Sequence, residues 1–226
     1  MPQNGVHAML GVTVRRWMPK REWLFLGIVL GNMFPDLDNL VVAYATLAKL
    51  PNPEQYHRTF THSVFTIVTA VVLFYIISTI TKNERWNNFG IGFGMGIFMH
   101  IVVDLILWFN GVELFWPLGS ELNFWTWFVV PGWLKILLDT GEFLAFGLYF
   151  LLLDSLARRY GTDADRLSSV RIWSYTEFIL FVLFTVLFFL IGPKGLPYQL
   201  FGGLYLLSLI FAIVMTIRMK QTVESI

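Results

Sequence analysis

The sequence predicts an all-α, polytopic membrane helix bundle with about five full spans and one or two half-span helices at the N-terminus. Hydrophobic residues make up 56% of the 226 positions and charged residues 14%, whereas soluble domains have about 45–50% and about 25%. The mean hydropathy is +0.64. A soluble chain of this length needs a polar surface, and this chain lacks the charges to make one.

Five stretches are long enough to cross a bilayer, whose core of about 30 Å needs about 20 apolar helical residues. Helix is required because backbone groups in hydrocarbon must be satisfied internally. The fifth stretch carries Lys135, Asp139 and Glu142 in its first turns, where we expect helix-end solvation. The five predicted spans are 61–80, 88–109, 172–191, 198–217 and 133–156.

Three shorter segments complete the predicted architecture. Residues 23–33 form a half-span that ends before Pro35, and residues 6–17 form a shorter amphipathic or half-inserted helix. Residues 114–133, rich in Phe and Trp, form an interfacial loop or short helix.

No signal-peptide pattern opens the chain, so we expect no cleavage. We predict one membrane domain over 1–226, with the site in 6–118 and an interfacial segment and three further spans in 119–226.

Charge predicts orientation and excludes some partners. The net charge of +1 predicts no nucleic-acid partner, and the absence of cysteine excludes disulfides and thiolate ligands. Basic residues mark the cytoplasmic face. If the helices alternate, 12 of the 16 Lys and Arg residues collect on one side, which predicts a multi-pass inner (plasma) membrane protein with a cytoplasmic C-terminus. These residues are Arg15, Arg16, Lys20, Arg21, Lys82, Arg85, Arg158, Arg159, Arg166, Arg171, Arg218 and Lys220.

His100 and Asp104 stand four residues apart within an apolar span, so they share one helix face. An ionisable residue at membrane depth is a functional hypothesis by default, because its burial is costly. The alternative is a buried hydrogen-bonded pair that joins two helices.

Asp36 and Asp38 follow Pro35 and flank Leu37. In an extended stretch, residues two apart project to the same side. Carboxylates directed together repel each other unless a cation or proton lies between them. The alternative is an Asp-rich turn in which Asp38 or Asn39 caps the next helix.

His57 and His62 precede the first long span. Five residues apart, they cannot share a helix face, so we place His57 in the loop and His62 near the helix start. They could instead be ordinary interfacial histidines, with Thr61 as the helix cap. The remaining histidine of the chain is His7, which by itself does not indicate a function.

These histidines and aspartates indicate a metal site more strongly together than any pair does alone. With alternating helices, all of them reach one depth in the outer half of the membrane, and imidazole with carboxylate suits Zn²⁺, Mn²⁺ or Fe²⁺. We therefore predict one or two divalent ions, with zinc favoured. We expect His62, His100, Asp104 and Asp36 or Asp38 to lie about 3–6 Å apart. The candidate ligands are His7, Asp36, Asp38, His57, His62, His100 and Asp104.

Five motifs in this order resemble the YdjM-like family of inner-membrane proteins, and the resemblance implies a metal-dependent hydrolase. It covers about residues 6–118. The family is in turn distantly similar to the zinc-dependent phospholipase C and single-strand nuclease superfamily, which holds zinc with a His–x3–Asp helix pair among other residues. The motifs are HAMLG at 7–11, GNMFPDLD at 31–38, HRTFTHS at 57–63, HIVVD at 100–104 and LFWPL at 114–118.

The resemblance implies a role for each matching residue. His62, His100, Asp104 and one of the two Asp residues at 36 and 38 would bind one metal, and His7 with a bridging Asp104 would bind a second. Arg58 would face the anionic group of the substrate. Two departures are Asn39, where the family often has His, and the absence of a second His–x3–Glu pair after Asp104, so we do not expect the superfamily's third metal. Asp139 and Glu142 are at about the right depth to replace that pair, but we expect helix-end solvation for them.

Together these observations predict a membrane-embedded hydrolase of a lipid or lipid-linked phosphoester, acting at the outer half of the bilayer. The Asp at 36 or 38 that is not a ligand would accept a proton from water. A transporter for metal ions or protons is one alternative, which needs polar residues through the full membrane thickness. A scaffold with a structural metal is the other, and it would be closed by four protein ligands.

Overall fold

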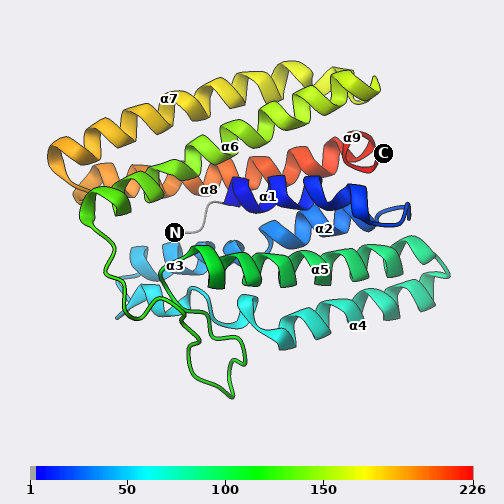
Figure 1. The fold of residues 1–226 in the computed structure, drawn as a ribbon, viewed down its shortest axis with the longest axis horizontal. Coiled ribbons are helices and arrows are strands. Elements are labelled where there is room, and N and C mark those ends of the chain that lie inside the picture. The colour runs from blue at the N-terminus through cyan, green and yellow to red at the C-terminus, as the bar shows by residue number, and fades with distance from the viewer. Residues whose placement is uncertain (1–3, 226) are drawn as a thin grey trace. The chain divides into compact units, whose positions relative to one another are not determined.

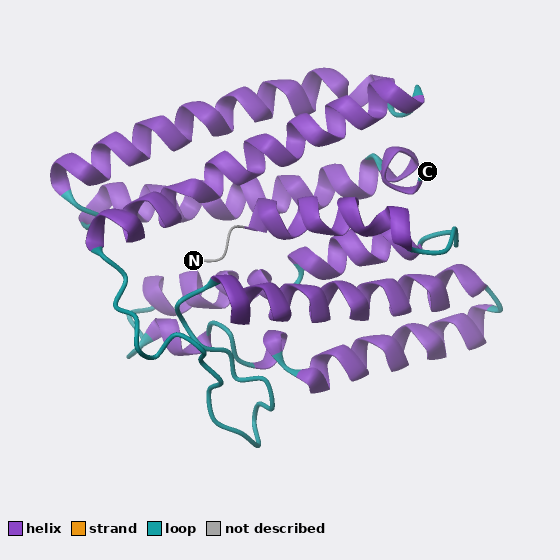
Figure 2. Ribbon diagram, in the orientation of Figure 1, coloured by secondary structure: helices purple, strands orange, loops and turns teal. Residues whose placement is uncertain are grey.

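The computed structural model describes residues 4–225, apart from the side chain of Arg16. Helices dominate these residues (Figure 1), and the longest loop joins α5 to α6 (Figure 2). The described chain contains no β-strand, only an isolated antiparallel bridge between Val112 and Leu122. The predicted all-α class is confirmed.

The α-helices are α1 Asn4–Thr13, α2 Leu24–Met33, α3 Asn39–Leu47, α4 Val64–Thr81, α5 Glu84–Leu107, α6 Gly132–Tyr160, α7 Leu167–Ile191, α8 Gly195–Arg218 and α9 Lys220–Glu224. Short 3-10 helices lie between them: η1 Val14–Trp17, η2 Pro35–Asp38, η3 Pro53–Tyr56, η4 Phe60–His62 and η5 Ala164–Arg166.

Five of the described helices, α4 to α8, are long and apolar enough to cross a membrane. The predicted half-span is α2, which is followed by a bend of 41° before Pro35–Leu47. Proline has no N–H to continue the helix and disfavours helical backbone at the residue before it. The loop from Trp108 to Pro131 contains no helix, so the loop alternative for 114–133 is the correct one.

Two compact units divide the chain. We call Leu10–Val129 the cluster unit, and Met1–Met9 with Val130–Ser225 the three-helix unit. The prediction of a single membrane domain is not tested by this division and stays a prediction.

In the cluster unit, glycine brings α2 and α5 into close contact. A Cβ on Gly92 or Gly96 of α5 would lie 2.1 or 2.3 Å from the backbone oxygens of Leu24 and Ile28 on α2. Gly31 of α2 approaches the backbone of α5 in the same way. Small residues four apart allow such backbone approach between membrane helices. This contact positions His100, one turn after Gly96, against the end of α2.

Helix α4 packs on the other side of α5, and the two run side by side in Figure 1. Ser63 caps α4 by accepting a hydrogen bond from the backbone N–H of Phe65 at 3.2 Å. Thr61, the cap considered from the sequence, therefore does not serve that purpose. Its position two residues earlier leaves it in η4.

The three-helix unit consists of α6, α7, α8 and the short α9, together with the first residues of α1. Gly5 lies directly against the backbone of Ala145, and the backbone N–H of Asn4 donates to Glu142 Oε2 at 3.1 Å. Asp139 and Glu142 are buried, so the expected helix-end solvation was wrong. A carboxylate is stabilising at the N-terminus of α1, where backbone N–H groups lack helical partners.

Candidate metal centre

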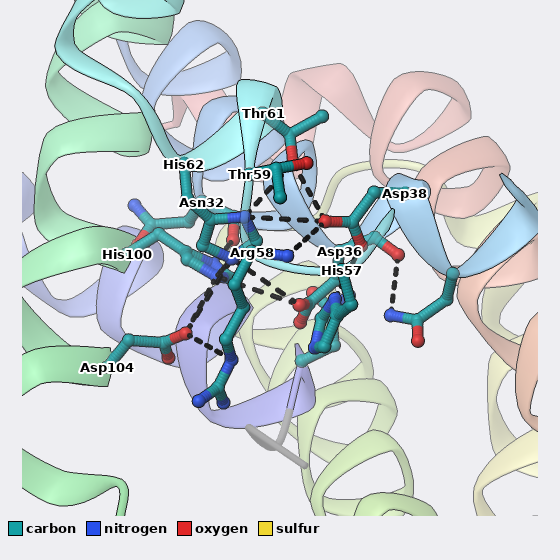
Figure 3. Close-up of polar contacts among 12 residues, drawn as sticks. Asn32, Asp36, Asp38, His57, Arg58, Thr59, Thr61, His62, His100 and Asp104 are labelled. Carbon is teal, nitrogen blue, oxygen red and sulfur yellow. Dashed lines mark hydrogen bonds and ion pairs between the residues drawn. The ribbon is translucent and has the colours of Figure 1, made fainter. Parts of the chain in front are cut away.

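Four ligand atoms from three elements meet in the interior of the cluster unit. They are Asp36 Oδ1 from η2, His62 Nε2 from η4, and His100 Nε2 and Asp104 Oδ2 from α5; we call these residues the His/Asp cluster (Figure 3). None of the four side chains is exposed. The structure thus brings together four of the seven side chains considered from the sequence.

Five of the six separations among these atoms lie between 3.2 and 3.9 Å. The two imidazole nitrogens are 3.2 Å apart. Asp104 Oδ2 is 3.7 Å from His62 Nε2 and 3.6 Å from His100 Nε2. Asp36 Oδ1 is 3.9 and 3.7 Å from the same nitrogens. His62, His100 and Asp104 form a group that could hold a metal ion.

Hydrogen bonds at the far side of each ring fix the imidazole tautomers. His100 Nδ1 lies 2.7 Å from the backbone oxygen of Asn32, and a carbonyl only accepts, so Nδ1 carries the proton. The Thr61 hydroxyl donates its one proton to Asp38 Oδ2 at 2.9 Å and therefore accepts from His62 Nδ1 at 3.0 Å. Burial also lowers the pKa of His62, which favours the neutral ring. A neutral ring of this tautomer carries its lone pair on Nε2, the atom that faces the cluster.

Asp36 and Asp38 lie in a helical turn and not in the extended stretch considered from the sequence, although one oxygen of each still lies within 4.8 Å of the other. Pro35 begins a 3-10 helix instead, in which three residues make a turn. Residues two apart therefore diverge by about 120°. As a result Asp36 faces Nε2 of His62, whereas Asp38 faces Nδ1 of the same ring, with Oδ2 at 3.5 Å.

Asp38 instead organises the segment that carries the histidines. Its Oδ2 accepts from the backbone N–H of Arg58 at 2.9 Å as well as from the Thr61 hydroxyl. Its Oδ1 lies 2.7 Å from His57 Nδ1. Asp38 directly precedes α3, but its side chain makes no capping hydrogen bond there, so the capping alternative was wrong for this residue.

Arg58 reaches the cluster from a strained backbone position. Its φ is +62°, a conformation that costs energy for a residue other than glycine. Its Nε lies 3.6 Å from Asp104 Oδ2, and Figure 3 shows the guanidinium extending toward that carboxylate. Within the described residues, Nη1 is buried and makes no hydrogen bond.

His57 lies outside the four-atom group. His57 Nδ1 is engaged by Asp38, its Nε2 makes no hydrogen bond in the described chain, and its side chain is 16% exposed. Asp36, Asp38 and His57 also form a group close enough to hold an ion. His7 lies on α1 within the three-helix unit, so its predicted approach to Asp104 stays a prediction.

Residues 1–221 match the family described as YdjM inner membrane protein. The chain belongs to the YdjM family. The match extends beyond the motif region of 6–118 into the last spans, so the YdjM character is not confined to the cluster unit. No curated protein and no solved structure matches the chain.

Sequence reasoning missed two partners of the YdjM histidines. One is the backbone oxygen of Asn32, which no side-chain motif reveals. The glycine pairs Gly27/Gly31 and Gly92/Gly96 could have predicted the contact between α2 and α5 that brings this oxygen to His100. The other is Thr61, considered only as a cap. Its spacing next to His62 carries no signal without the fold.

Proposed function

We propose that this YdjM protein is a metal-dependent hydrolase of the inner membrane, with a divalent cation held by the His/Asp cluster. One observation carries the proposal. Two imidazole nitrogens whose rings donate elsewhere face each other at 3.2 Å, with the carboxylates of Asp36 and Asp104 beside them. Lone pairs and negative charges collected in this way repel one another unless a cation lies between them.

The geometry and the chemistry of the donors fit such a cation. Atoms about 2.1 Å from a tetrahedral zinc are about 3.4 Å from one another, and the five measured separations run from 3.2 to 3.9 Å. Histidines that ligate metals usually donate their other N–H to a carbonyl or carboxylate, as His100 does to Asn32. Two imidazoles and two carboxylates suit zinc, manganese or iron.

The reaction that suits this site is hydrolysis of a phosphoester. A P–O bond to the leaving group breaks, a P–O bond to the oxygen of water forms, and one proton of the water passes to the leaving oxygen. A bound divalent cation supplies a water of lowered pKa and polarises the phosphoryl oxygen. The buried guanidinium of Arg58 lies beside the cluster and pairs well with a phosphate.

We assign the proton transfer to His57. Asp38 accepts from Nδ1 of the ring and orients it, so the lone pair of Nε2 is left to accept a proton from water and return it to the leaving oxygen. This assignment differs from the sequence prediction, which gave proton transfer to Asp36 or Asp38. Asp36 is engaged in the His/Asp cluster, and Asp38 already accepts hydrogen bonds from several donors.

The alternatives receive less support. A transporter needs polar groups along its path, but α5 carries no His, Asp, Glu, Lys or Arg between Arg85 and His100. A purely structural metal site has no use for the buried guanidinium of Arg58 beside its ligands.

The distribution of basic residues supports a site that faces outward and a cytoplasmic C-terminus. A cysteine at Asn83, in the basic turn between α4 and α5, would be the single thiol of the chain. We expect a membrane-impermeant thiol reagent to label it only after the cells are lysed. Ready labelling in intact cells would reverse the orientation.

The substitution Asp104→Asn tests the function directly. It removes a charged ligand while keeping the volume, so bound metal should fall, and phosphoester hydrolysis should fall by about a hundredfold or more. Thermal unfolding should change less, because apolar packing holds the spans. The matched control is Glu177→Gln, the same exchange of acid for amide at a buried position of α7, which should retain metal and activity.

An Asp104→Asn protein with full metal content and unchanged hydrolysis would contradict the proposal. His100 and Asp104 would then be a structural hydrogen-bonded pair.

A further inference from the structure

The loop that follows α5 presents apolar side chains outward. In residues 113–129, which we call the aromatic loop, Leu118 is 81% exposed, Trp127 73% and Val129 88%. Phe115, Trp116 and Phe124 are exposed as well. Soluble surfaces rarely gather so many apolar side chains without a partner to cover them.

The aromatic loop is an ordered structure rather than a loose connection. Its base is closed by the bridge between Val112 and Leu122, and Glu121 Oε1 accepts from the backbone N–H of Gly111 at 2.8 Å. The rings of Trp125 and Phe128 pack against Phe109, with centroids 5.4 and 4.9 Å away. The exposed side chains are therefore held outward by half-buried neighbours.

The same loop is joined to the segment that carries Arg58 and His62. The backbone N–H of Glu113 donates to the Arg58 oxygen at 3.1 Å, and the N–H of Val64 donates to the Leu114 oxygen at 2.9 Å. The Ser63 hydroxyl donates to the Trp116 oxygen at 3.1 Å. These bonds place the loop beside the ends of α4 and α5 where the His/Asp cluster lies, and hence at a membrane boundary.

Its composition identifies the partner. The loop contains three Trp and three Phe residues, no Lys or Arg, and only Glu113 and Glu121 as charges. Trp is enriched at the headgroup level of bilayers. A segment with no basic residue does not recruit anionic surfaces by charge, so its attraction is to the apolar and interfacial part of the leaflet.

We propose that the aromatic loop seats in the leaflet at this end of the bundle and presents the phosphate of a phospholipid headgroup to Arg58. This proposal rests on the proposed hydrolase function and narrows its substrate to a phosphoester held in the membrane. A phosphoester dissolved in water would gain nothing from the loop.

The first arm of the test locates the loop without any assay of activity. In full-length protein in phosphatidylcholine nanodiscs, a single Leu118→Cys site carries an environment-sensitive fluorophore. We expect lipids brominated on their acyl chains to quench it more than aqueous iodide does. The control is Gln221→Cys, at an exposed position of α9, where iodide should be the stronger quencher.

Stronger quenching of the Leu118→Cys probe by iodide would overturn the proposal. Shielding from both quenchers would also overturn it, because a second protein chain would then cover the loop.

The second arm compares two substrates. A Leu118→Ser/Trp127→Ser variant and the unchanged protein are assayed on a fluorescent phospholipid in nanodiscs and on soluble p-nitrophenyl phosphate. Two lost apolar anchors should lower the ratio of lipid to soluble turnover about tenfold or more. An equal fall on both substrates, or no fall, would overturn the proposal.

If the unchanged protein hydrolyses neither substrate, the hydrolase function is contradicted. The proposal that the loop presents a phosphate to Arg58 then fails with it. The quenching measurement would still decide, separately, whether the loop enters the leaflet.

Discussion

In the cluster unit, buried His and Asp side chains meet in one network with Arg58 and Thr61, whereas in the three-helix unit buried hydroxyls form separate local bonds. The single residue Asp38 contacts three others, His57, Thr61 and His62. In the three-helix unit, by contrast, Tyr149 pairs with Thr216, and the Ser174 hydroxyl donates to the Gly147 oxygen. Paired hydroxyls satisfy each other's hydrogen bonds inside a membrane. Burying several ionisable side chains together is costly, and such a network therefore indicates a function.

The residues proposed for chemistry and the helices that form most of the spans therefore belong to different parts of this chain. The three-helix unit supplies three of the helices able to cross a membrane, and its buried hydroxyls form local pairs. The cluster unit supplies α4 and α5, and its polar groups converge on one point. Matched substitutions in the two units can test whether metal binding depends on the cluster unit alone.

The largest effect is expected where helix contact supports the cluster. A Gly96→Ala methyl would meet the backbone oxygen of Ile28 at 2.3 Å and force α2 from α5. We expect a loss of about 1–3 kcal/mol or more in unfolding free energy, together with loss of bound metal, because Asn32 would no longer hold His100. Denaturant unfolding and metal analysis measure the two effects.

The matched control is Gly203→Ala in α8, where a methyl meets nothing within 4 Å. It should leave metal content unchanged and stability equal or higher by about 0.5–1 kcal/mol. Equal damage from both substitutions would show that the α2–α5 contact has no special role.

A smaller effect is expected from Asp38→Asn. The amide keeps one acceptor oxygen but cannot accept from His57, Thr61 and the Arg58 backbone together, so His62 loses its orientation. Loss of such an outer partner typically weakens metal affinity about 10–100-fold, which a competitive chelator titration would measure.

Asp163→Asn is its counterpart in the three-helix unit. Asp163 Oδ2 likewise accepts two hydrogen bonds from Thr222, each of 2.8 Å. That substitution should affect the packing of α9 and leave metal affinity unchanged. An Asp38→Asn protein that titrates like Asp163→Asn would remove Asp38 from the site.

Hydropathy predicted the spans well because the bilayer imposes a length and excludes charge. The predicted 198–217 became Gly195–Arg218, and 61–80 became Val64–Thr81. The gathering of His62, His100 and Asp104 was also predictable, because ionisable residues are rare in such a chain. Their ordered motifs indicated the family before the fold was known.

The arrangement within the site could not be predicted. Whether Asp36 or Asp38 faces His62 Nε2 depends on the 3-10 turn after Pro35, and an extended stretch gave the wrong geometry. The partner of His100 is a backbone oxygen, which sequence motifs do not encode. The burial of Glu142 depends on its contact with the start of α1, 138 residues away.

The central claim is that the His/Asp cluster holds a divalent metal, and X-ray absorption on the purified protein tests it most directly. We expect a bound zinc, manganese or iron ion with nitrogen and oxygen ligands at about 2.0–2.2 Å. The spectrum should show scattering from two imidazoles and no sulfur, and His100→Gln should remove one imidazole. A protein that binds none of these ions on addition, with a neutral-pH NMR spectrum showing His62 and His100 protonated on both nitrogens, would contradict the account.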